Sequence, residues 1–229
     1  MDTSNTSKKS TIILGIILTL LLLFIGPFFS FPVLKSITTN FEGLFIGSRF
    51  YYWICLGLIY LYVSKIEKQK FLLWPETNYS VLEYIQQIFI TFMSVLGVVF
   101  VVSLLLMIFK LNNESVKLEQ LNQIMKNNIP LIVFTSITAG VTEELIFRGY
   151  LIPRFELFMK HKILPSLLSS LIFGLIHFGY GTLPQIIGPF FIGLTFALFY
   201  KKYKSIHVVI MCHFLWDVMA IMIQTNAPK

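Results

Sequence analysis

Apolar runs long enough to cross a membrane recur along almost the whole chain, and they restrict its fold more than any other feature. A helix needs about 20 residues to cross a hydrocarbon layer of about 30 Å. About seven runs approach or exceed that length, at 11–31, 42–64, 86–109, 129–148, 163–180, 184–200 and 206–224. Inside lipid a helix satisfies its own backbone polar groups. We therefore expect an all-α transmembrane bundle of about seven spans.

Composition and charge support this assignment and exclude two other classes of protein. Of 229 residues, 56% are hydrophobic and 13% are charged, which leaves too little polar surface for an ordinary soluble domain. The net charge of +7 does not indicate nucleic-acid binding, because the basic residues form short clusters between apolar runs. The clusters at 65–70, 154–162 and 201–204 are typical of cytoplasmic loops. We predict a multi-pass cell-membrane protein with a cytoplasmic N-terminus and no nucleic-acid partner.

Two polar segments, 65–83 and 110–128, divide the chain. In the second, Leu118, Leu121 and Met125 recur at helical spacing among polar residues, which predicts a helix on the membrane surface. Within a single membrane domain, we expect residues 1–128 to form peripheral spans and this surface helix. Residues 129–224 would form a four-helix core, in which the short turn before Pro184 makes the flanking helices antiparallel neighbours.

Charged side chains inside hydrocarbon cost several kcal/mol, so each one requires an explanation. The apolar runs of the second half contain three groups of such residues: Glu143-Glu144-x-x-x-Arg148, Phe173-x-x-x-His177 and His213-x-x-x-Asp217.

Helical spacing gives the two adjacent glutamates different neighbours. Residues four apart share a helix face, so Glu144 can pair with Arg148, and His213 shares a face with Asp217. Glu143 is turned by about 100° from Glu144 and has no such local partner.

These side chains are sufficient for peptide hydrolysis without a covalent intermediate. Apolar surroundings disfavour the charged form of a carboxylate, which suits a general base acting near neutral pH. Water held between Glu143 and His177 could be deprotonated and delivered to a carbonyl. His213, with Asp217 on its face, could stabilise the oxyanion or protonate the leaving amine. No Ser or Cys is placed in these groups as a nucleophile would be.

The three motifs together resemble the CPBP family, which comprises the CAAX proteases and bacteriocin-processing enzymes and is also called the Abi family. Its pattern is EExxxR, FxxxH and HxxxN or HxxxD, each on its own transmembrane helix, and the resemblance covers about residues 129–224. It implies a glutamate-dependent intramembrane endopeptidase that uses no metal and no cofactor. Glu143 would be the catalytic base, assisted by His177, and Glu144 with Arg148 would form a supporting ion pair.

The resemblance places His213 and Asp217 at the oxyanion-stabilising positions. Prenyl-processing relatives have Asn at the last position, and a carboxylate cannot donate a hydrogen bond as Asn does. Asp217 is therefore either protonated in an apolar site or serves to orient His213. Phe173, one turn from His177, is expected to act in packing.

Several residues also have simpler interpretations. Glu143 could line a water-filled cavity, His177 could join two helices by a hydrogen bond, and Arg49 is most simply explained as reaching toward a membrane interface. Two histidines and a glutamate are also zinc ligand types, although no HExxH motif is present.

Residue usage typical of a low-GC bacterium makes a prenylated substrate improbable. The expected substrate is a membrane-associated peptide or protein, such as a leader peptide, a bacteriocin or a signalling-peptide precursor, and self-immunity against a bacteriocin fits the same family. The alternative from another class is a non-proteolytic immunity or scaffold protein.

If all the spans were straight, the three motifs would lie at different depths in the membrane. His177 would lie nearer the far side of the membrane than Glu143 and His213. They can meet only if spans are tilted or if the helix at 163–180 begins inside the membrane.

Overall fold

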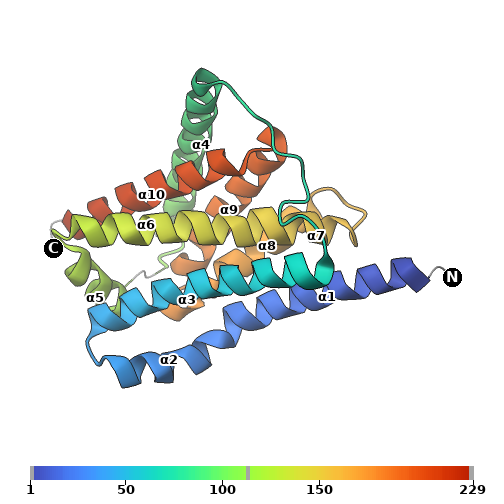
Figure 1. The fold of residues 1–229 in the computed structure, drawn as a ribbon. Coiled ribbons are helices and arrows are strands. Elements are labelled where there is room, and N and C mark those ends of the chain that lie inside the picture. Colours follow the sequence, from blue (N-terminus) through green and yellow to red (C-terminus); the bar gives the residue numbers. More distant parts are fainter. Residues whose placement is uncertain (1–2, 112–113, 227–229) are drawn as a thin grey trace.

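The protein is a bundle of helices. The computed structural model describes residues 3–111 and 114–226, and this part of the chain contains no strand, which confirms the predicted all-α fold. Figure 1 shows the N- and C-termini at opposite ends of the bundle. The α-helices are α1 (Thr3–Phe24), α2 (Gly26–Ile37), α3 (Phe41–Tyr62), α4 (Val81–Ile108), α5 (Val116–Met125), α6 (Ile129–Glu144), α7 (Ile152–Glu156), α8 (Leu164–Leu175), α9 (Pro184–Tyr203) and α10 (Ile206–Asn226).

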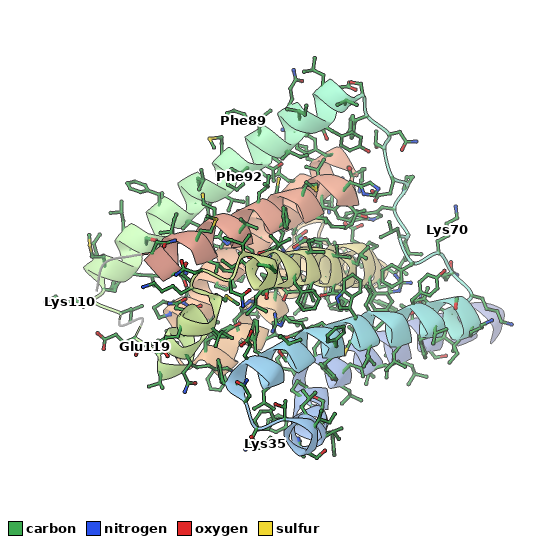
Figure 2. All side chains as sticks on the ribbon, turned by 60° about the vertical axis from the view of Figure 1, so that its left-hand side comes forward. Lys35, Lys70, Phe89, Phe92, Lys110 and Glu119 are labelled. Atoms are coloured by element: carbon green, nitrogen blue, oxygen red, sulfur yellow. The ribbon has the colours of Figure 1, made fainter. Side chains whose placement is uncertain are left out.

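A 28-residue helix at the centre of the bundle organises the fold. It runs over Ile129–Glu156 and comprises α6, a π-helical segment η2 (Leu145–Leu151) and α7. In its most apolar stretch 61% of the residues are buried, against 17% in α4. The outer helices instead expose large apolar side chains, among them Phe89 on α4, which is labelled in Figure 2. This distribution suits a bundle whose outer surface faces lipid.

Within the described residues, four helices are long and apolar enough to cross a membrane. They cover Phe41–Glu67, Val81–Ile108, Ile129–Glu156 and Ile206–Asn226. The bent pair α1–α2 would add a fifth. The apolar helix at 164–180 is shorter, so the number of seven spans stays a prediction.

The first apolar run is not one straight helix, as the span at 11–31 would require. The chain bends by 43° between α1 and α2. Pro27 lies in the first turn of α2, and its ring has no N–H to bond to a carbonyl in the preceding turn. The break therefore has a local cause that length and hydropathy do not reveal.

The span expected at 129–148 also needs correction, because the helix continues to Glu156. The π-helical segment, a feature frequent at functional sites, carries the chain from Glu144 to α7. As a result, Arg154 does not lie in a cytoplasmic loop. It is fully buried, and its guanidinium lies 2.6 Å from the carboxylate of Glu67, the last residue of the π-helical segment η1 (Val63–Glu67) that follows α3.

The predicted helix in the 110–128 segment is confirmed as α5. Its Leu121 and Met125 are buried with Phe45 of α3 and Leu131 of α6. The apolar face of α5 thus covers one end of the bundle. Figure 2 shows Glu119 of this helix at the opposite end from Lys70.

Candidate active site

A cavity of about 310 Å³ inside the bundle brings together side chains from three separate helices. Glu143 comes from α6, His177 from the 3-10 segment η3 (Ile176–Tyr180), and His213 and Asp217 from α10. All four line this cavity, although more than 30 residues separate each helix's contribution from the next. The predicted meeting of the three motifs is therefore present in the fold.

His177 reaches the cavity because its helix is short. The α8 helix has 12 residues and begins at Leu164, after a turn that follows α7. The η3 segment then takes the chain over the end of α8. The helix begins at Leu164, one residue after the predicted start at 163, so where it begins relative to the membrane stays a prediction.

Glu144 and Arg148 form a buried ion pair directly behind the cavity wall. The Arg148 Nη1 atom lies 2.7 Å from Glu144 Oε1, and both side chains are at most 1% exposed. Arg148 also donates to the carbonyl of Gly193 at 2.9 Å, and its guanidinium lies 4.5 Å from the centre of the Phe173 ring. The pairing expected from their i, i+4 spacing is thus observed.

His213 is held by Glu144. The ring donates from Nδ1 to Glu144 Oε1 at 2.7 Å, so its Nε2 faces the carboxylates on the cavity side. Asp217 Oδ1 lies 3.7 Å from that Nε2, beyond a hydrogen bond, and Glu143 Oε2 lies 3.8 Å from it. The group that fixes this imidazole is therefore Glu144 and not Asp217. Phe196 stacks on the ring at 5.4 Å between centroids.

His177 has a defined tautomer because its Nδ1 lies 2.8 Å from the carbonyl oxygen of Phe173. A carbonyl can only accept, so Nδ1 carries the hydrogen and Nε2 of the neutral ring is free to accept a proton. The Phe173 ring packs edge-on against His177 and His213, with centroids 5.0 and 6.0 Å away. Phe173 thus sets the position of both rings, by its carbonyl and by its side chain.

Glu143 differs from its neighbour Glu144, which is bonded to Arg148 and His213. Among the described residues Glu143 makes no hydrogen bond, and its contact with His213 is 3.8 Å long. The side chain is 8% exposed, and that exposure is toward the cavity. A carboxylate in this state can bind a water molecule or a polar group of a ligand.

Sequence reasoning missed one charged residue of the cavity wall, Arg49 of α3. We expected it to reach toward a membrane interface, but it lines the same cavity as Glu143 and His177. The faces of Phe45 and Tyr52 hold its guanidinium, with centroids 4.8 and 5.1 Å away. The sequence signal that could have identified Arg49 as a cavity residue was its position inside an apolar run. Only the packing of α3 against α6 shows which way the side chain points.

No group of three or more His, Cys, Asp or Glu side chains is arranged to hold a metal ion in the part of the chain that the structure describes. The polar groups that line the cavity include two carboxylates, two imidazoles and one guanidinium. Together they can take up, hold and return protons.

Two comparisons with known proteins give matches. Residues 125–219 match a family model described as "Rce1-like: Type II CAAX prenyl endopeptidase Rce1-like". The chain is also 26% identical over 126 residues to the "Putative membrane peptidase YdiL" of Bacillus subtilis (strain 168). That alignment covers 53% of this chain and 48% of the relative, so the chain spans about half the length of the protein it matches. No solved structure matches the chain.

Proposed function

Residues 125–219 belong to the Rce1-like family of type II CAAX endopeptidases, within the CPBP group, and from this premise we propose that the chain is an intramembrane endopeptidase. The observation that carries the proposal is the convergence of Glu143, His177 and His213 on one cavity inside an apolar bundle. Polar groups of this kind are costly in hydrocarbon and mark functional sites. The bilayer and a membrane-associated peptide or protein are then its partners.

In the proposed reaction Glu143 is the general base. Its carboxylate takes a proton from a water molecule in the cavity, and the water oxygen attacks the carbonyl carbon of the substrate. The free Nε2 of His177 accepts a hydrogen bond from the same water and orients it. Glu143 then returns the proton to the leaving amine, so that one water is consumed for each peptide bond broken.

His213 stabilises the oxyanion in this scheme. With its Nδ1 bound to Glu144, the doubly protonated ring presents an N–H at Nε2 to the negative charge that develops on the carbonyl oxygen. Arg148 holds Glu144, so the ion pair sets the position of the donor. Asp217, 3.7 Å from Nε2, contributes negative charge beside the imidazolium and does not orient the ring. No metal or cofactor takes part in any step.

We further propose that the protein is a multi-pass cell-membrane protein with its N-terminus in the cytoplasm. The basic segments at 65–70 and 201–204 lie at the end of the bundle that also holds the N-terminus (Figure 1), as cytoplasmic loops would. Its substrate class would be a bacterial leader peptide, bacteriocin or signalling-peptide precursor, or a bacteriocin against which the cell is protected.

The test compares new peptide termini, identified by mass spectrometry, in membranes of cells that make the native protein or Glu143→Gln. A matched control is Glu119→Gln, the same change at an exposed position of α5. Termini present with the native protein and the control, and absent with Glu143→Gln, are the expected result. An identical set from all three, at equal protein levels, would contradict proteolysis by Glu143 and favour a non-proteolytic immunity or scaffold protein.

A further inference from the structure

Arg49 is the one arginine of the described chain that has no carboxylate partner. Arg148 and Arg154 each lie within 2.7 Å of a glutamate oxygen, whereas no carboxylate of residues 3–111 and 114–226 lies within 4.0 Å of Arg49. A cation on an apolar helix without a partner is unfavourable unless it binds something. The free-energy cost of the Arg49 charge therefore indicates a role other than stabilising the fold.

The surroundings of Arg49 hold the guanidinium but leave its donors almost unused. Phe45 and Tyr52 contact it through their ring faces, and its hydrogen bonds are two long ones of 3.4 Å to the Ser48 hydroxyl. A guanidinium has five N–H groups in a planar fork that matches a carboxylate. Rings that orient the fork without occupying it leave it prepared for an anion.

The position of Arg49 relates it directly to the candidate active site. It lines the same cavity as Glu143, His177 and Asp217, and its charge is close enough to act on all three. An anion bound by Arg49 would thus lie in the same cavity as the bond to be cleaved.

A second cation lies near this end of the cavity. Lys117 of α5 donates to the carbonyl of Gly179 at 3.1 Å and lies over the Tyr180 ring. Burial, together with the nearby charge of Arg49, lowers the pKa of Lys117. Lys117 already has a hydrogen-bond acceptor and is not part of the cavity wall, so it provides a matched control for Arg49.

We propose that Arg49 binds a carboxylate of the substrate inside the cavity and thereby places the scissile bond next to Glu143. This rests on the proposed proteolytic function and adds a specificity-determining residue and a substrate class to it. The carboxylate is either the C-terminus of the substrate chain or an Asp or Glu side chain beside the cleaved bond. The first source makes the enzyme cut near chain ends, and the second makes it cut at acidic positions.

Binding can be measured without cleavage. The full-length chain carrying Glu143→Gln, purified in detergent, is titrated into short Leu- and Ala-rich peptides with an uncharged fluorescent label at the N-terminus. One pair of peptides differs only in a free or amidated C-terminus. A second pair, both amidated, differs only in an internal Glu or Gln. Fluorescence anisotropy reports the affinity for each.

We expect one of the acidic peptides to bind about 10-fold more tightly than its neutral partner. Adding Arg49→Gln should abolish this preference, and Lys117→Gln should keep it. The pair that shows the preference identifies the source of the carboxylate. Removing an unpaired cation from an apolar helix should not destabilise the fold, so Arg49→Gln should unfold at the native temperature or above it.

Three results would overturn the proposal. The first is equal affinity for the acidic and neutral peptides, which includes the case in which neither binds. The second is a preference for the acidic peptide that survives Arg49→Gln. The third is that Arg49→Gln lowers the affinity for all four peptides alike. The last would mean that Arg49 only balances the charges of Glu143 and Asp217. Because binding is measured in the Glu143→Gln background, failure of this test is separate from failure to find proteolysis.

In the native chain the same idea predicts a split in the kinetic constants. Arg49→Gln should raise KM for the preferred acidic substrate and leave kcat largely unchanged. A fall in kcat that is equal for acidic and neutral substrates would contradict carboxylate binding.

Discussion

Two buried glutamate–arginine pairs lie along the central helix, and they differ in what surrounds them. The pair Glu144–Arg148 lies beside the cavity. The pair Glu67–Arg154 lies about two turns further along, where Arg154 reaches Glu67 in the segment η1 that follows α3. Their shortest N–O distances are nearly equal, at 2.7 and 2.6 Å. Distance and burial alone would therefore not separate a functional pair from a structural one.

Hydrogen bonding separates them. Both oxygens of Glu67 are occupied, because Arg154 binds both and the Tyr150 hydroxyl donates to Oε1 at 2.8 Å. Arg154 uses further donors on the carbonyls of Lys70 and Phe71. In the described chain, Glu144 Oε2 has no partner, and its Oε1 is shared between Arg148 and His213.

This difference indicates two roles. A fully satisfied pair such as Glu67–Arg154 joins three parts of the chain and stabilises only the fold. The Glu144–Arg148 pair fixes the orientation of the His213 ring. The Nε2 atom of that ring faces Glu143 and Asp217 on the cavity side. Incomplete satisfaction of a buried polar network is unfavourable, and such sites are often functional.

The largest stability effect should come from breaking the structural pair. Arg154→Met leaves the Glu67 charge buried without its cation, with only the Tyr150 hydroxyl still donating to it, and should cost about 3–5 kcal/mol of the free energy of unfolding. The double variant Glu67→Met with Arg154→Met removes both charges and should regain most of the lost free energy of unfolding. The thermal midpoint in detergent measures both. Equal destabilisation by the single and double variants would contradict the assignment of a closed, charge-balanced pair.

Breaking the pair beside the cavity should affect activity more than stability. Glu144→Gln weakens the hold on the His213 ring and should slow cleavage by about 10- to 100-fold, the usual effect of losing a carboxylate that orients a histidine. Its midpoint should fall less than that of Arg154→Met, because the Gln side chain keeps an oxygen that accepts from Arg148, which also keeps the Gly193 carbonyl.

The matched control for Glu144→Gln is Glu156→Gln on the same central helix. Glu156 pairs with Lys201 in a half-exposed bridge, which is worth about 0–1 kcal/mol. Neither cleavage nor the midpoint should change much. Cleavage by Glu144→Gln at the native rate would show that His213 does not depend on this pair.

The two ion pairs can also be compared by adding a methyl group at a glycine that packs against each of them. A Cβ at Gly15 would lie 2.5 Å from Glu67 Oε1, and a Cβ at Gly193 would lie 2.8 Å from Arg148 Nη2. Each Gly→Ala change should therefore cost about 1–3 kcal/mol through overpacking. Only Gly193→Ala should also slow cleavage per folded molecule, measured against the thermal midpoint of each variant. An equal loss of specific activity in Gly15→Ala would remove the distinction between the two pairs.

The smallest expected effect is that of a metal chelator. Because the proposed mechanism assigns the activation of water to Glu143, incubation with 1,10-phenanthroline should leave the cleavage rate of the purified protein unchanged. Inhibition that is reversed by added zinc would favour the metal-dependent alternative.

The sequence predicted the fold class and the content of the candidate site, because both depend on local spacing. Apolar runs gave the helices, and i, i+4 spacing gave the Glu144–Arg148 pair. Long-range packing determined the rest. Nothing near Arg49 in sequence shows that it lines the same cavity as Glu143, and nothing near Arg154 shows a glutamate partner 87 residues away. The relation of His213 to Glu144, rather than to Asp217, likewise depends on how α10 lies against α6.

We propose that Glu143 activates water for peptide hydrolysis while the Glu144–Arg148 pair holds His213 in place. The most direct test uses purified native protein and Glu143→Gln, reconstituted in lipid, with a substrate peptide identified from the cell membranes. Glu143→Gln should cleave it about 100- to 10,000-fold more slowly and keep the native thermal midpoint. Cleavage by Glu143→Gln at the native rate, with the same midpoint, would contradict the account.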